Sequence, residues 1–245
     1  MKKLTLTLIV IILSISKTNA SIITSSASDF FLDLAAQVDP TQSATNEWQI
    51  GMYNGSVFEL FEYSASTVLG RSAIVGWVKD SFHAGFLNTS SSDEVFPGNV
   101  FGAGTLNLHP GQSGAYIVLR YLVQQGSEYN ISGHFFAIDT IESPGRNSDG
   151  VNVSVRVNGN QLNDDRNITG FGPITTHQVT GSDITLQQGD IIDFIVKPRD
   201  NYFDDATVVT ASVSRGASTS VSEPATIALM LFFTSILWVR RRSNR

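Results

Sequence analysis

Apolar and polar residues alternate with a period of two along several stretches of the chain, which is the pattern of half-buried β-strands. The clearest stretch, GVNVSVRVNGN, has apolar side chains at Val151, Val153, Val155 and Val157. Asn158-Gly159 follows it directly and predicts the tight turn of a hairpin. The stretch DIIDFIVK repeats the pattern, so we expect Asp193 and Lys197 to be exposed on the polar face of a strand.

Similar short runs recur along the chain, separated by Gly, Asn, Asp and Pro. The further predicted strands span residues 48–53, 57–63, 73–78, 105–108, 114–123, 130–138 and 207–214. A short helix is predicted at 28–36, and the polar insertions 87–99, 139–150 and 163–181 are predicted to be loops. Many short strands without an internal repeat indicate an all-β protein with one β-sandwich domain over residues 21–215.

The first residues have the layout of a secretory signal peptide. The positive stretch 1–3 precedes an apolar run at 4–15. Small residues then occupy the positions that a signal peptidase reads, so residues 1–20 are predicted to be removed before Ser21. The apolar run is shorter than the roughly 20 residues that span a bilayer, which favours cleavage over the alternative of a retained membrane anchor.

The C-terminal residues predict a single transmembrane helix. Residues 225–239 are apolar apart from Thr and Ser, and Arg240, Arg241 and Arg242 follow at once. By the positive-inside rule these arginines stay in the cytoplasm, and the mature domain lies outside the inner membrane. The span is shorter than the usual minimum of roughly 17 residues, and arginines that snorkel extend its effective length. A buried core helix is the alternative, but it would not explain the adjacent arginines.

The tail as a whole, residues 222–245, resembles a known sorting signal. Ser222, Glu223 and Pro224 precede the apolar helix and the arginine cluster, and the small residues at 216–221 form a flexible linker before them. This three-part order is that of the PEP-CTERM signal of exopolysaccharide-producing Gram-negative bacteria, with Ser222 in place of its first proline. The resemblance implies exosortase as a partner, removal of the tail near Glu223-Pro224, and release of the domain to the cell surface or extracellular matrix.

The charge balance makes nucleic acid an improbable partner. The chain has a formal charge of −6, to which residues 1–20 contribute +3 and residues 223–245 contribute +3, so residues 21–222 carry −12. Phosphate binding needs a basic surface, whereas an acidic exported domain more naturally meets neutral polymers, cations or other proteins. The chain also lacks cysteine, which excludes disulfides and Cys-ligated metal sites.

No residue pattern indicates catalysis. The GQSGA stretch around Ser113 is not a nucleophile elbow, and the four histidines lack the spacing of a helical zinc site. Two carboxylates flanking one bond would be needed for glycoside hydrolysis. Asp190 with Asp193, or Asp139 with Asp149, offers such a pair, but acids near strand ends are common in an acidic domain. We therefore predict a protein that is not an enzyme, with a polysaccharide hydrolase or lyase as the alternative.

The segment 104–213 also resembles a known module. The motifs TLNLHPG, YNISGHFFAID, VNVSVRVNG and LQQGDIIDFIV follow one another in the order of a jelly-roll module found in PEP-CTERM and polysaccharide-associated proteins. That module is similar to the galactose-binding-like carbohydrate-binding sandwiches. The resemblance implies a jelly-roll-like sandwich and extracellular polysaccharide as a partner, although it fixes no particular ligand.

Carbohydrate recognition needs an aromatic plane for the apolar face of a sugar and polar groups for its hydroxyls. The candidate aromatic residues are Trp48, Trp77, Phe82, His83 and Tyr202, and the candidate polar partners are Arg120, Asp139 and Asp149. Trp77 lies in an apolar run and is also a candidate for the core. Tyr202 lies in a polar loop, which favours exposure to solvent.

The stretch KPRDNYFDDAT is a candidate calcium site. Asp200, Asn201, Asp204 and Asp205 place four hard oxygen ligands close together, which suits Ca²⁺ outside the cell. An exposed turn capped by Asx side chains is the competing interpretation.

These observations combine into one prediction of function. The chain is expected to be exported, held at the inner membrane by its C-terminal helix, and processed by exosortase to an extracellular matrix or biofilm protein. Its sandwich is expected to bind carbohydrate or to act as a structural component, and a protein-binding surface module is a further alternative.

Overall fold

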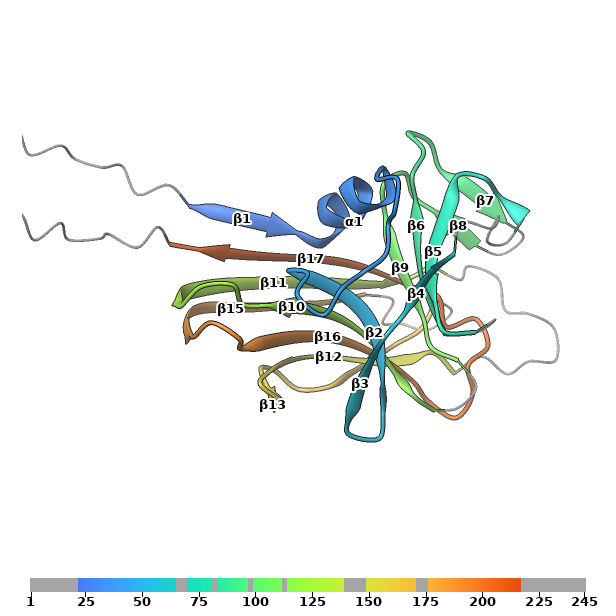
Figure 1. Cartoon of the computed structure of the whole chain (residues 1–245). Coiled ribbons are helices and arrows are strands. Elements are labelled where there is room, and N and C mark those ends of the chain that lie inside the picture. Colours follow the sequence, from blue (N-terminus) through green and yellow to red (C-terminus); the bar gives the residue numbers. More distant parts are fainter. Residues whose placement is uncertain are drawn as a thin grey trace, which may run out of the picture. The chain divides into compact units, whose positions relative to one another are not determined.

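Two antiparallel β-sheets pack face to face and bury their apolar sides against each other (Figure 1). The computed structural model describes residues 22–64, 70–80, 83–96, 99–111, 114–138, 149–170 and 176–216. Every strand pairing among these residues is antiparallel, and all of them belong to one unit, Ile22–Gly216. The predicted β-sandwich is therefore confirmed.

The first sheet has eight strands in the described residues. Along the sheet they are β15 (Thr176–Leu186), β11 (Ser127–Ala137), β17 (Thr207–Arg215), β9 (Leu106–His109), β6 (Ala84–Asn88), β5 (Ile74–Val78) and β4 (Glu62–Ser64), with β1 (Ile23–Ser26) also paired to β17. The second sheet has seven: β13 (Asn160–Gln161), β12 (Val151–Val157), β16 (Ile191–Pro198), β10 (Tyr116–Leu122), β2 (Trp48–Asn54) and β3 (Val57–Leu60), with β14 (Arg166–Ile168) paired to β12. β7 (Glu94–Phe96) and β8 (Asn99–Phe101) form a separate hairpin.

The period-two pattern places the core as predicted. In β12 the side chains of Val151, Val153 and Val155 are buried, and the alternate apolar residues of β16 and β17 are buried against them. The predicted turn is also confirmed, because Asn158 and Gly159 have φ angles of 52° and 78° and join β12 to β13 as a two-residue loop. Positive φ at both positions is the requirement of a type I′ turn.

The predicted helix forms one residue earlier than expected. α1 (Ala27–Ala35) begins after Ser26, whose hydroxyl accepts a hydrogen bond from the backbone N–H of Asp29 at 3.5 Å. This is the usual role of a serine at a helix N-cap. The helix buries Phe31 and Leu34 in the main core, so it packs along one margin of the sandwich.

Four predictions about local structure are wrong. The predicted strand 57–63 is broken at Phe61, since β3 lies in one sheet and β4 in the other. The predicted loop 163–181 contains β14 and the first half of β15, and the predicted loop 87–99 contains β7. Asp193, which was expected to face solvent, is buried with 1% of its surface exposed, because Arg120 covers and neutralises it.

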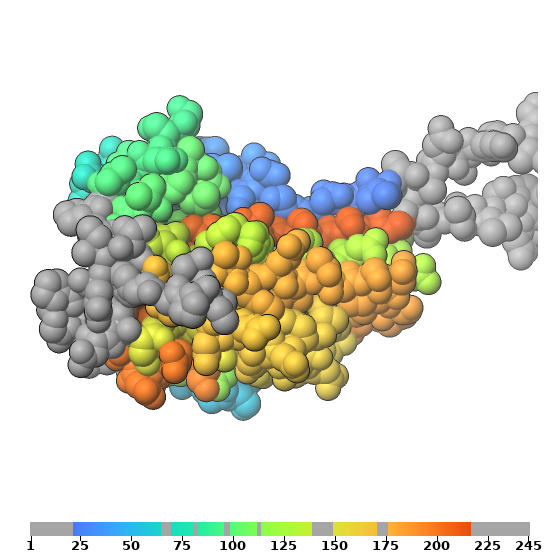
Figure 2. Space-filling model, turned by 180° about the vertical axis from the view of Figure 1, so that it is seen from behind, coloured from blue at the N-terminus to red at the C-terminus, as the bar shows by residue number. Residues whose placement is uncertain are grey.

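The first and last described strands lie side by side. Ile23 pairs with Arg215 in the β1–β17 ladder, and Figure 2 shows the blue N-terminal strand lying along the red-orange C-terminal strand. The predicted signal peptide 1–20, the remainder of the linker at 217–221 and the sorting signal 222–245 lie outside the described residues. Among the described residues, no helix has the length and apolar character to cross a membrane.

Candidate functional site

A hollow of about 560 Å³ opens at one end of the sandwich, where the β2–β3 turn, the β5–β6 connection and the start of β10 come together. We call it the end hollow. It is lined by Met52, Tyr53, Asn54, Gly55, Lys79, Asp80, His83, Gly114, Ala115 and Tyr116. Its volume is in the range of small-ligand sites, and its lining combines aromatic rings with a few polar groups, as such sites do.

Four half-exposed side chains extend from the hollow across neighbouring strands. Tyr53 on β2 pairs with Tyr116 on β10, and Lys197 on β16 pairs with Asn152 on β12. The amine of Lys197 lies 4.9 Å from the centre of the Tyr116 ring, which joins the two pairs into one line. We call these four residues the tyrosine row. Three strand spacings correspond to a length of about 14 Å.

An ion pair beside the row fixes the position of Tyr53. Arg120 donates two hydrogen bonds to Asp193, from Nε to Oδ1 at 2.7 Å and from Nη2 to Oδ2 at 2.9 Å. The Tyr53 hydroxyl accepts a hydrogen bond from Arg120 Nη2 at 2.6 Å and donates one to Asp193 Oδ2 at 2.8 Å. The Arg120 guanidinium also lies 3.7 Å from the centre of the Phe58 ring. Because charge-assisted bonds hold its hydroxyl, the ring of Tyr53 is fixed before any ligand arrives.

The same contacts change the ionisation of this cluster. Burial raises the pKa of Tyr53 above its ordinary value, and the nearby Asp193 carboxylate raises it further. Burial alone would lower the pKa of Arg120, but its bonds to Asp193 and the attraction between the charges outweigh this and raise it. The cluster therefore keeps a neutral phenol beside a charged pair at physiological pH.

The opposite wall of the hollow is built by the short connection between β5 and β6. Asp80 accepts a hydrogen bond from the backbone N–H of His83 at 2.9 Å, and its other oxygen lies 2.8 Å from Nδ1 of the same residue. The His83 ring packs against Gly111, where a Cβ atom would lie only 2.5 Å from it. A glycine is therefore required at 111 for this ring position.

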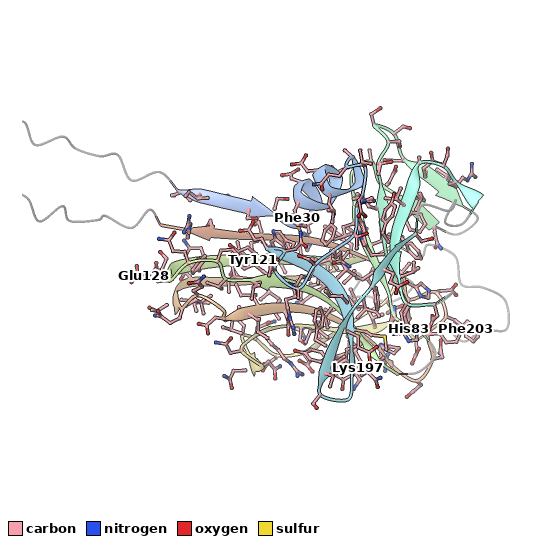
Figure 3. The ribbon with its side chains drawn as sticks, viewed as in Figure 1. Phe30, His83, Tyr121, Glu128, Lys197 and Phe203 are labelled. Atoms are coloured by element: carbon pink, nitrogen blue, oxygen red, sulfur yellow. The ribbon has the colours of Figure 1, made fainter. Side chains whose placement is uncertain are left out.

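The rim of the hollow carries a second polar cluster. Lys79 forms an ion pair of 3.1 Å with Glu59, and Asn54 donates a hydrogen bond of 3.0 Å to the same carboxylate. The hydrogen bonds from Asn54 and Lys79 lower the pKa of Glu59. The hollow thus has amide, amine and carboxylate groups at its edge and two tyrosine rings along one side (Figure 3 labels His83 and Lys197 at this end).

The structure disperses the residues that the sequence proposed for carbohydrate binding. Trp48 and Trp77 are fully buried in the core, where their ring N–H groups bond to Ser25 and to the carbonyl of Pro40, so neither ring faces solvent. Arg120 belongs to the ion-pair cluster beside the tyrosine row. His83 lines the end hollow.

Two of the remaining proposed residues, Tyr202 and Asp149, do not line the hollow. Tyr202 stacks on Phe203 at a ring distance of 4.5 Å, and Asp149 accepts a hydrogen bond from the backbone N–H of Asp200 at 2.6 Å. Asp139 and Phe82 lie outside the described residues. The sequence analysis did not select Tyr53 or Tyr116 as binding residues. The two become neighbours through the register of β2 against β10.

The candidate calcium residues lie in the connection between β16 and β17. Within the described ranges, no three His or carboxylate side chains gather closely enough to hold a metal ion, and those ranges include Asp200, Asp204 and Asp205. The Asn201 side-chain oxygen instead accepts a hydrogen bond from the backbone N–H of Phe203 at 2.9 Å, as in an Asx turn. The local geometry favours the turn interpretation of this stretch.

Of the two carboxylate pairs considered for hydrolysis, Asp190 with Asp193 makes structural contacts, and Asp139 of the other pair lies outside the described residues. Asp193 uses both oxygens on Arg120 and Tyr53, while Asp190 accepts a hydrogen bond of 2.7 Å from the backbone N–H of Gln187 in the turn before β16. The end hollow itself has tyrosine rings on which a sugar ring can stack and polar groups that can bond to sugar hydroxyls. These contacts are those of a binding site.

Comparison with known proteins yields matches among solved structures alone. No family model matches the chain, and no curated protein matches it. One similar structure is CBM51-2 in complex with GlcNAc and INT domains from Clostridium perfringens ZmpB, with 18% identity, a TM-score of 0.34, and coverage of 49% of this chain and 24% of that one. The chain thus spans about a quarter of that protein's length.

Two further similar structures cover more of this chain. TmCBM61 in complex with β-1,4-galactotriose has 15% identity, a TM-score of 0.35, and coverage of 69% of this chain and 88% of that one. The enzymatically active domain of tailspike protein 4 from bacteriophage CBA120 has 8% identity, a TM-score of 0.31, and coverage of 70% and 19%. Likeness at this level does not assign the chain to a family.

Proposed function

We propose that this chain is an exported, exosortase-processed matrix or biofilm protein with a jelly-roll-like sandwich that binds extracellular polysaccharide and performs no catalysis. The observation that carries the binding proposal is the pairing of Tyr53 with Tyr116 at the mouth of the end hollow. Two neighbouring rings, both half-exposed, offer a surface on which the apolar faces of sugars stack.

The polar groups around the rings suit sugar hydroxyls. Asn54, Lys79 and Asp80 line the hollow and supply amide, amine and carboxylate groups. The row continues over Lys197 to Asn152, so its length of about 14 Å suits a short oligosaccharide rather than a single sugar. Because Tyr53 is already held by Arg120 and Asp193, binding costs little ordering of that side chain.

The proposals for export and processing rest on the terminal sequences. The positive start with its apolar run supports removal of residues 1–20, and the order of Glu223-Pro224, apolar segment and Arg240 to Arg242 supports exosortase as the processing partner at the inner membrane. Neither removal would delete a residue of the end hollow. In the described unit, β1 begins and β17 ends at the end opposite His83 (Figures 1 and 3).

The test is a binding assay on exported protein purified from cells that express the full chain. We expect saturable binding to at least one extracellular polysaccharide without new reducing ends. Tyr116→Ala should weaken it by roughly tenfold, because a stacking surface is lost. Tyr202→Ala is the matched control, since it removes a tyrosine that does not line the hollow.

Three results would count against the proposal. Absence of binding to every polysaccharide would favour a structural or protein-binding role. Equal affinity of the Tyr116→Ala variant and the unmodified protein would move the site elsewhere. New reducing ends would support the alternative of an enzyme, which is a lyase if the opposite new ends are unsaturated and a hydrolase if they are saturated.

A further inference from the structure

The outer face of the seven-stranded sheet has a charge opposite to that of the domain. Residues 21–222 carry −12 in formal charge, yet the outward positions of β10, β12 and β16 include Arg120, Arg156 and Lys197. The carboxylate on the outward positions of these three strands is Asp193, which is buried and bound to Arg120. Among the described residues, the other two cations, Arg156 and Lys197, form no ion pair with a carboxylate.

Arg156 is held next to a carboxylate that is already used. It lies directly opposite Asp193 in the β12–β16 ladder. Both oxygens of that carboxylate are taken by Arg120, and one also accepts a bond from Tyr53. The Nε atom of Arg156 is buried and has no hydrogen-bond partner among the described residues. A buried guanidinium N–H without an acceptor is costly. Because Arg156 as a whole is half-exposed, an anionic ligand at its exposed part would partly offset that cost.

Lys197 likewise forms no ion pair with a carboxylate in the part of the chain that the structure describes. The ion pairs found in the described part of the chain involve Arg71, Lys79, His83 and Arg120. The amine of Lys197 instead lies over the Tyr116 ring, which leaves its charge beside the surface proposed for sugar stacking. An aromatic ring attracts the charge of an amine but does not neutralise it.

The spacing of these two cations indicates the form of the ligand. Four residues along β16 separate Lys197 from the position opposite Arg156. With a rise of about 3.4 Å per residue and one strand spacing between them, their Cα atoms are roughly 14 Å apart. A single acidic sugar would not contact both, whereas a polymer with several acidic sugars would span the distance.

We propose that the polysaccharide bound by this domain is acidic, and that Lys197 and Arg156 recognise its uronate carboxylates while Tyr116 stacks on a sugar ring. This proposal rests on the proposed carbohydrate-binding function and specifies its ligand. A guanidinium matches a carboxylate through two parallel N–H bonds, and the amine acts as a point charge.

The experiment compares matched polymers that differ in charge alone. Exported protein from the full chain is titrated with polygalacturonate, alginate and hyaluronan, and with the fully methyl-esterified form of each. We expect the acidic form of at least one polymer to bind at least about tenfold more tightly than its ester at low salt, and the preference to shrink as salt screens the charges.

Variants assign the preference to the two cations. The double variant Lys197→Gln with Arg156→Gln should bring the ratio of acidic to esterified affinity close to one. Arg215→Gln removes one positive charge at the far end of the sandwich, beside β1, and should leave the ratio unchanged. Folding of each variant is checked by its urea midpoint, so a loss of ratio is separated from a loss of structure.

The outcomes distinguish this inference from the function on which it rests. Equal binding of acid and ester by the unmodified protein would overturn the inference and keep carbohydrate binding. Binding of neutral polysaccharides alone would also overturn the inference and keep carbohydrate binding. Failure to bind any polysaccharide would remove both, and an acidic preference that survives in the double variant would show that these two residues are not its source.

Discussion

Arg120 and Asp193 lie directly opposite each other on β10 and β16, joined by hydrogen bonds of 2.7 and 2.9 Å on the outer face of a sheet. Outward positions of a strand usually face water, but here Asp193 is 1% exposed. Burial of the pair costs desolvation free energy, which the attraction between the two charges offsets. Removal of either residue leaves the other charge buried without a partner.

The first prediction concerns this pair. Asp193→Ala should lower the free energy of unfolding by about 3 kcal/mol, because Arg120 would be left buried and unpaired. The measurement is urea denaturation followed by circular dichroism. Glu128→Gln is the control, since this exposed carboxylate lies at the other end of the sandwich (Figure 3) and should change stability by less than about 0.5 kcal/mol. Equal effects of the two variants would contradict a role for the buried pair.

Alkaline pH should destabilise the folded protein, because three of its tyrosines have raised pKa values. The pKa values of Tyr53, Tyr121 and Tyr129 are raised, in each case chiefly by burial. A raised pKa means that the folded state keeps the proton after the unfolded chain has lost it, so stability falls as pH rises above the ordinary tyrosine value of about 10.

Ultraviolet titration of tyrosinate tests this expectation. In the folded protein, part of the absorbance change should be delayed to higher pH than in the urea-unfolded chain, and it should coincide with loss of the circular dichroism signal. Tyr53→Phe should reduce the delayed part. A folded protein whose tyrosines all titrate together with those of the unfolded chain would rule the idea out.

The fold was predictable where one face of a strand is uniformly apolar. β12, with Val151, Val153 and Val155, and β17 follow the simple alternation, so their inner faces could be read directly. β15 was missed because it is an edge strand, with Val179 as the one fully buried residue of its first half. A strand exposed on both faces has no periodic apolar signal and resembles a polar loop.

The candidate site was harder to predict than the fold. Trp48 and Trp77 were selected by residue type, but their size makes them the natural fill of the core, and the structure buries both. Tyr53 and Tyr116 become neighbours through the register of β2 against β10, which tertiary packing determines. The expected exposure of Asp193 failed for the same reason, since its partner Arg120 belongs to another strand.

The approach of the two sheets gives a prediction about packing. Gly133 on β11 faces Phe194 on β16, and a Cβ atom at 133 would lie 2.8 Å from the ring. Gly133→Ala should therefore destabilise the protein by about 1–3 kcal/mol, because the ring must shift in a filled core. Gly216→Ala is the matched control, since its Cβ would meet no atom within 4 Å. Thermal melting compares the two, and equal melting temperatures would contradict the close approach.

The buried tryptophans give the last prediction, which separates stability from binding. Trp48 packs against Tyr121 and Phe194 at ring distances of 5.0 and 5.9 Å and donates a hydrogen bond of 2.8 Å to Ser25. Trp48→Phe loses that bond and part of the volume, so we expect a loss of about 1–3 kcal/mol in urea denaturation. Polysaccharide affinity, measured on the folded variant by calorimetry, should stay within about twofold of the unmodified protein, because small changes far from a site seldom couple to it. The reverse pattern, with affinity lost and stability kept, would return Trp48 to the binding surface and remove the end hollow from that role.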